Sequence, residues 1–197
     1  MRESKATRTP ASGDSALIVV VPEWASGDIA AWRRAYDPNH RAIPPHVTVV
    51  YPPFVPVAQW QHARAGLAAT IQQFEPFEVV FRELDTFAGL PAVLWLRPED
   101  GGVLYRLNAA IAKSIPEYVA ALPFEYVPHL TIGFFASGEE SEAAQHAVGA
   151  SFSLLRFRVD ALAYTVFDAY GTWHRYDEIP LGSPQGSTAG GHDGFDN

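Results

Sequence analysis

The sequence predicts an α+β domain of two similar lobes, in which mostly antiparallel sheets line a central groove and helices cover the outer faces. Two observations predict this fold. Short runs that alternate apolar and polar residues, typical of strands, are interspersed with longer runs that carry apolar residues at helical spacing. One five-residue pattern also occurs twice, as PHVTV at 45–49 and PHLTI at 128–132. The two histidines are 83 residues apart, which is the placement expected of a duplicated half-domain.

The first half of the chain begins with a continuous apolar run at 16–21, which is typical of a strand buried on both faces. Residues 26–28 can cap a helix that extends to Tyr36, where the Asp-Pro-Asn sequence ends it. The first motif predicts a strand over 46–51, which is terminated by two prolines. A helix is expected over 57–74, with one apolar stripe formed by Trp60, Ala63, Leu67 and Ile71.

The second half shows the same mixture of elements. Strands at 77–84 and 92–96 are joined by a Gly-Leu-Pro turn, and a helix follows over 103–115. The second motif predicts a strand over 127–135, and an acidic first turn opens a helix over 137–148. The remaining strands are expected at 152–159, 162–167 and 173–179, the last two as a hairpin.

Length and composition predict one domain, because 197 residues form one substantial core. We expect this domain to span residues 15–181. Residues 1–14 and 182–197 are polar and rich in small residues, so both ends are expected to be disordered tails.

Charge and residue usage restrict the partners. The net charge of −8 and the lack of any Lys/Arg run disfavour a long nucleic-acid duplex, which needs a basic surface, but leave open a small nucleotide or a short RNA end. No apolar run approaches the roughly 18 residues that span a bilayer. The chain has no cysteine, which excludes disulfides and thiol nucleophiles. We expect a cytoplasmic monomer without a membrane anchor.

Strand alternation sorts the motif residues into two faces. One face is predicted to carry His46, Thr48, Val50, His129, Thr131 and Gly133, and the other Val47, Val49, Tyr51, Leu130, Ile132 and Phe134. If the two polar sets meet across a groove, the site holds two imidazoles and two hydroxyls. With a pKa near roughly 6.5, a histidine pair supplies one base and one acid for a displacement at phosphorus, while the hydroxyls bind phosphate oxygens. The expected chemistry needs neither a metal ion nor a cofactor.

The paired His-x-Thr motifs resemble those of the 2H phosphoesterase superfamily, and within it the bacterial 2′-5′ RNA ligase-like (LigT-type) proteins. The resemblance covers roughly residues 15–181 and is carried by the motifs at 45–54 and 128–133. It implies a bilobal fold with a pseudo-two-fold axis and phosphoesterase activity on 2′,3′-cyclic phosphates or 2′-5′ linkages of nucleotides or short RNA. It also implies that His46 and His129 are general acid and base and that Thr48 and Thr131 bind phosphate. Which histidine is the acid stays open.

Other residues are weaker candidates. Arg41 and Arg175 can assist phosphate binding, although solvated arginines are the simpler interpretation. Aromatic side chains that can stack on a base are Tyr51, Tyr126, Phe135 and Trp173. Two alternative functions remain open: a nucleotide or phosphate sensor that uses the same groove without turnover, and a metallohydrolase that uses His46 and His129 as metal ligands.

Overall fold

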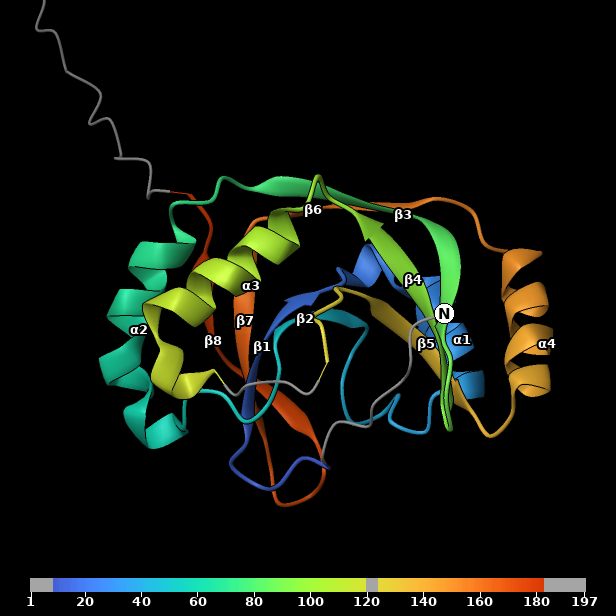
Figure 1. The fold of residues 1–197 in the computed structure, drawn as a ribbon, viewed down its shortest axis with the longest axis horizontal. Coiled ribbons are helices and arrows are strands. Elements are labelled where there is room, and N and C mark those ends of the chain that lie inside the picture. The colour runs from blue at the N-terminus through green and yellow to red at the C-terminus, as the bar shows by residue number, and fades with distance from the viewer. Residues whose placement is uncertain (1–8, 120–123, 183–197) are drawn as a thin grey trace, which may run out of the picture.

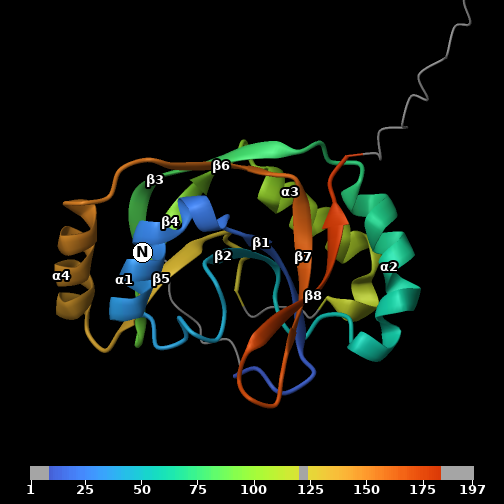
Figure 2. The same ribbon diagram turned by 180° about the vertical axis from the view of Figure 1, so that it is seen from behind.

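The computed structural model describes residues 9–119 and 124–182. Eight strands form one sheet in the order β6-β3-β4-β5-β2-β1-β7-β8, and every neighbouring pair is antiparallel. The strands are β1 (Ser15–Val20), β2 (His46–Val50), β3 (Phe77–Phe87), β4 (Ala92–Glu99), β5 (Leu130–Phe135), β6 (Leu155–Val159), β7 (Ala161–Phe167) and β8 (Trp173–Pro180). The sheet curls strongly (Figures 1 and 2), so that its two edges approach each other: only Asp160 separates the end of β6 from the start of β7, and the N–H of Leu181, just after β8, donates to Asp160 O at 2.8 Å.

Four helices cover the outer side of this sheet. At one end, α1 (Gly27–Tyr36) packs on β5, and α4 (Gly138–Gly149) packs on β3, β4 and β5. At the other end, α2 (Val57–Ile71) and α3 (Val103–Ser114) pack on each other (Figure 1). Helix α2 also packs on β8, and α3 also packs on β2. Two short 3-10 helices, η1 (Glu23–Ala25) and η2 (Pro116–Tyr118), complete the described elements.

The sheet divides at its centre into two similar halves. Strands β2 and β5, which carry the two motifs, pair there, and each is flanked by the partner that precedes it in the chain, β1 beside β2 and β4 beside β5. Helix α1 connects β1 to β2 but packs on β5, whereas α3 connects β4 to β5 but packs on β2. The bilobal, pseudo-two-fold α+β arrangement predicted from the sequence is therefore confirmed, with one continuous sheet running through both lobes.

The two sides of the sheet differ in what covers them. The side under the helices, here called the helix face, carries the main core, which includes Leu17, Val47, Leu130 and Trp60 of α2, each at most 1% exposed. Trp60 stacks on Tyr164 with ring centroids 3.6 Å apart. The other side, here called the open face, carries only a small apolar cluster around Ile18 and Ala163. The motif histidines and threonines lie on the open face and are partly exposed.

A bulge interrupts each motif strand directly after its threonine. The register of β1 with β2 shifts by one residue between Leu17 and Ile18, and that of β4 with β5 shifts between Leu94 and Trp95. The extra residue reverses the alternation, as β-bulges do. The expectation from simple alternation is thus wrong beyond each threonine, since the buried Val50 and Gly133 lie on the helix face.

Element boundaries agree with the sequence prediction within about three residues; for example, β3 extends to Phe87 and α2 ends at Ile71. At the ends, the N–H of Gly13 donates to Phe167 O and that of Gly182 donates to Phe74 O, so backbone pairing extends slightly beyond the expected domain limits of 15 and 181. The rest of the two expected tails, residues 1–8 and 183–197, lies outside the described residues. Among the described helices, none is long and apolar enough to cross a bilayer.

Candidate functional site

The register of the two central strands brings the four motif side chains together. Val47 of β2 pairs with Leu130 of β5. Extending this antiparallel register by one residue in each direction places His46 opposite Thr131 and Thr48 opposite His129, with the two histidines on a diagonal. Diagonal neighbours in an antiparallel pair lie about 7–8 Å apart, with their Cβ atoms somewhat closer, so the two imidazoles belong to one site.

Both imidazoles are oriented by the same backbone contact. The Nδ1 of His46 lies 2.8 Å from Pro44 O, and the Nδ1 of His129 lies 2.7 Å from Val127 O. A carbonyl oxygen only accepts hydrogen bonds, so each Nδ1 carries the proton and donates it. The Nε2 of each neutral ring is then a free base, and on protonation it becomes an N–H donor. Both rings are therefore set up to exchange a proton through Nε2.

The surroundings favour the neutral form of both rings. The pKa of His46 is lowered to about 4, mainly by burial; the Pro44 carbonyl opposes this shift, and the positive charges of Arg33 and of a protonated His129 add to it. Burial also lowers the pKa of His129. A bound phosphate would act in the opposite direction, because a nearby negative charge stabilises an imidazolium.

An aromatic wall flanks the site on the β5 side. Trp95 of β4 pairs with Thr131, and its ring centroid lies 5.8 Å from that of His129. The Phe87 ring stacks on Trp95 at 4.7 Å and meets His129 edge-on at 4.9 Å. Neither residue is among the site residues that the sequence predicts. Phe87 lies beyond the predicted end of the third strand at Leu84, and Trp95, although inside the predicted strand 92–96, comes next to His129 only through the pairing of β4 with β5. The signal in the sequence that points to them is that Phe87 and Trp95 are aromatic residues on either side of the Gly-Leu-Pro turn.

The opposite wall is apolar and mostly aliphatic. Ile18 and Val20 of β1 pair with Thr48 and His46. The small open-face cluster continues this wall with Ala16, Ile43, Ala163 and Trp173. The predicted stacking residue Trp173 thus packs in this cluster, where its ring also meets Phe167 at 5.2 Å.

Two predicted tyrosines lie together beside the first motif. The Tyr126 hydroxyl donates to the backbone oxygen of Thr48 at 2.9 Å, and its ring meets that of Tyr51 at 6.3 Å. Burial raises the pKa of both phenols, so both stay neutral. The Tyr126 hydroxyl therefore joins the segment before His129 to the strand that carries His46.

The remaining predicted residues lie outside the four-residue site. Phe135 lies on the helix face, 6% exposed and packed against Tyr36, because of the bulge in β5, so the prediction that it stacks on a base is wrong. Arg175 is exposed and pairs with Glu178 at 2.9 Å. Arg41 borders a pocket next to the first motif. Over residues 9–119 and 124–182, no group of three or more His, Asp or Glu side chains is arranged to hold a metal ion.

Comparison with known proteins identifies the family. The profile of the 2′-5′ RNA ligase superfamily matches residues 20–171. The chain belongs to this superfamily. Proteins named "Putative phosphoesterase" from Geobacillus thermodenitrificans and Bacillus licheniformis are 24% and 26% identical, over 85% and 78% of this chain and 96% and 95% of theirs.

Solved structures share the fold of this superfamily member. Escherichia coli LigT complexed with 3′-AMP has a TM-score of 0.62 and 15% identity, with coverage of 88% of this chain and 100% of that one. TT0787 of Thermus thermophilus has a TM-score of 0.61 at 15% identity, with coverage of 86% and 99%. At these identities the likeness establishes the fold.

Proposed function

We propose that the protein is a phosphoesterase that acts on 2′,3′-cyclic phosphates or 2′-5′ linkages of nucleotides or short RNA, with His46 and His129 as acid and base. The observation that carries this proposal is the diagonal pair of imidazoles, each with a free Nε2 and each opposite a threonine. The family membership and the phosphoesterase names of the relatives support it. Structures of LigT with 3′-AMP, ATP and NADP+ support a small nucleotide as the ligand.

The chemistry proceeds by one displacement at phosphorus. The Nε2 of one neutral histidine takes a proton from water as the water oxygen bonds to phosphorus. The bond between phosphorus and the 2′ or 3′ oxygen breaks, and the other histidine, protonated at Nε2, donates its proton to the departing oxygen. The Thr48 and Thr131 hydroxyls donate to the non-bridging oxygens, which carry the negative charge. Proton exchange with solvent restores both rings. The residues themselves supply every proton transfer.

The aromatic wall gives this reaction a place for the base. Phe87, which is partly exposed, presents aromatic surface next to His129, and the buried Trp95 stacks behind it; base stacking on such a ring contributes about 1–3 kcal/mol. On the opposite wall, the aromatic side chain is Trp173, which packs in the open-face cluster and against Phe167. We place the nucleoside on the β5 side because the Phe87 ring directly contacts His129.

The test compares single-histidine variants on cyclic nucleotides and 2′-5′ dinucleotides in the presence of EDTA. His46→Ala and His129→Ala should each lower kcat by about 10²–10⁴-fold, the usual contribution of a general acid or base. His62→Ala, an exposed histidine of α2, is the matched control and should keep full activity.

Equal turnover by the variants and the wild type would contradict the proposal. Tight nucleotide binding without any product would instead support a sensor. Activity that disappears with EDTA would support the metallohydrolase.

A further inference from the structure

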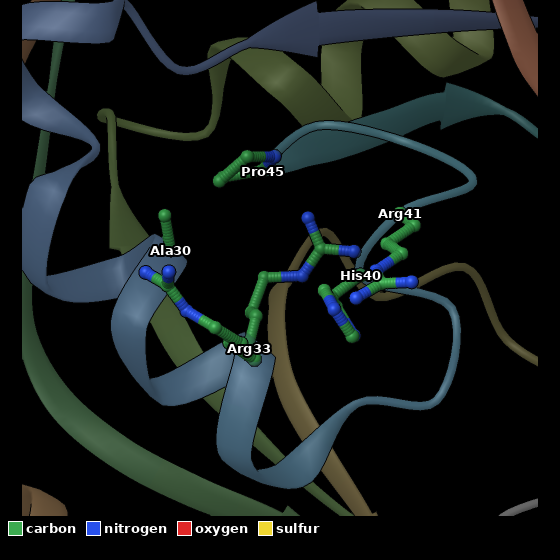
Figure 3. Close-up of a pocket in the computed structure, with 6 residues that line it drawn as sticks. Ala30, Arg33, His40, Arg41 and Pro45 are labelled. Atoms are coloured by element: carbon green, nitrogen blue, oxygen red, sulfur yellow. The ribbon is translucent and has the colours of Figure 1, made fainter.

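A cationic pocket adjoins the first motif, between α1 and the loop that leads into β2. Its volume is about 280 Å³, and Figure 3 shows the side chains around it. We call it the arginine pocket, and its lining residues are Ala30, Arg33, Arg34, His40, Arg41 and Pro45. Pro45 directly precedes His46, so the pocket adjoins the backbone of the first motif. The charge of Arg33, which lines the pocket, also acts on the His46 imidazole.

One arginine builds the pocket and is already neutralised. Arg33 is 3% exposed and donates from Nε and Nη2 to Asp37 Oδ2 at 3.0 and 2.7 Å. Its Nη1 donates to Ile43 O at 2.9 Å, so it ties α1 to the loop before His46. Asp37 is fully engaged by this contact and by the N–H of Asn39. The ion pair thus forms a rigid wall of the pocket with little net charge.

The other two arginines supply uncompensated charge. Arg34 and Arg41 are exposed, and neither makes an ion pair with any residue in the described part of the chain. His40 donates through Nδ1 to Asp37 O at 2.9 Å, which leaves its Nε2 as a further polar group. The protein as a whole has a net charge of −8, so this group of positive charges next to the motif contrasts with the rest of the chain. Guanidinium groups match phosphate oxygens in geometry and charge.

We propose that the arginine pocket binds a second phosphate group of the substrate, separate from the one that reacts between the histidines. The inference rests on the proposed function and narrows its substrate class. The preferred substrate is a nucleotide that carries an additional phosphate, either a terminal monoester or the phosphodiester of a short oligonucleotide. A nucleoside whose only phosphate is the reacting one leaves the pocket empty.

Three compounds distinguish the sources of the second phosphate: a nucleoside 2′,3′-cyclic phosphate, the same compound with a 5′-phosphate, and a dinucleotide that ends in the cyclic phosphate. The wild type should prefer at least one two-phosphate compound by ten-fold or more in kcat/KM. The double variant Arg34→Gln/Arg41→Gln should lose most of that preference. Arg156→Gln/Arg158→Gln removes the same charge from β6, four strands from β2, and should retain it.

Binding gives a second readout that does not need turnover. Calorimetry should show tighter binding of a nucleoside 2′,5′-bisphosphate than of the 2′-monophosphate, and the difference should disappear in the double variant. Turnover without preference for either two-phosphate compound, or a preference that survives the double substitution, overturns the arginine pocket and leaves the proposed function intact. Absence of turnover with all three compounds contradicts the proposed function. In that case, equal affinities for the 2′,5′-bisphosphate and the 2′-monophosphate also overturn the proposal that the arginine pocket binds a phosphate.

Discussion

At the scale of single residues, the decisive feature is how each motif histidine is held. A backbone carbonyl two residues upstream accepts from Nδ1 in both motifs, at 2.8 and 2.7 Å. This contact selects one tautomer and directs the same nitrogen of each ring to the substrate. Burial at the same time keeps both rings neutral in the empty site. One of the two histidines therefore becomes protonated, and can then act as the acid, at acidic pH or when an anion binds.

This proton uptake predicts a displaced pH profile. The kcat/KM profile reports the free enzyme, in which both histidine pKa values lie below the ordinary 6.5, so its maximum should fall below pH 6.5 and its value should decrease as pH rises. In the complex, the phosphate charge raises both pKa values, so the kcat optimum should lie at higher pH. A phosphodiester keeps one negative charge throughout this range, so the titration belongs to the enzyme. A kcat/KM value that increases from pH 6 to 8 would contradict this assignment.

At the scale of elements, the bulge after each threonine separates the part of the strand that carries the candidate site from the part that packs in the core. Before the bulge, the polar residues of the motif lie on the open face. After it, β5 turns Gly133 and Phe135 toward α1. Helix and strand are in direct contact there, since a Cβ built on Gly133 would lie 2.4 Å from the Cβ of Tyr36 and 2.9 Å from its backbone oxygen.

Gly133→Ala should therefore be strongly destabilising. The added methyl group forces α1 away from β5, and overpacking of this kind costs typically about 1–3 kcal/mol, here at the upper end because backbone must move. Thr131, two residues away, should shift with the strand, and this displacement should lower kcat. Urea unfolding and turnover measure both effects.

Gly66→Ala in α2 is the control for this substitution. A Cβ there meets nothing within 4 Å, and replacing a helical glycine should stabilise by about 0.5–1 kcal/mol. A Gly133→Ala protein as stable as the wild type would show that α1 and β5 are not in such close contact.

The sequence predicts the elements and the four motif residues because both depend on local pattern. Periodicity identifies strands and helices, and the repeat identifies His46 and His129. It does not predict the bulges, because an extra residue in a ladder is defined only by the partner strand. Phe135 was therefore assigned to the wrong face. The aromatic wall of Phe87 and Trp95 and the buried Arg33–Asp37 pair likewise depend on long-range packing around the motifs.

At the scale of the whole molecule, the two halves are joined where the motif strands meet. Val47 and Leu130 pair in the sheet, and side chains of the second half reach the backbone of the first. The Tyr126 hydroxyl donates to Thr48 O at 2.9 Å, and Asn108 Nδ2 donates to Val49 O at 2.8 Å. These bonds fix the position of one histidine relative to the other.

Tyr126→Phe should loosen this connection. Loss of one hydrogen bond to a partly buried carbonyl should lower the free energy of unfolding by about 1 kcal/mol, and the less constrained histidines should lower kcat several-fold. Tyr105→Phe, which removes an exposed hydroxyl of α3, should change neither quantity. Denaturant titration and steady-state kinetics compare the two variants, and an unchanged Tyr126→Phe protein would leave the sheet pairing as the main connection.

The unlike walls have one consequence for the products. Because the two motifs are alike, a phosphate could bind between them in two orientations. Turning the substrate end over end would exchange which histidine acts as the acid and which acts as the base. Phe87 contacts the His129 ring, whereas Ile18 and Val20 flank Thr48 and His46, so the two orientations would place the nucleoside against different surfaces. Under the proposed chemistry the regiochemistry of ring opening, toward a 2′- or a 3′-monoester, then depends on Phe87 as well as on the histidines.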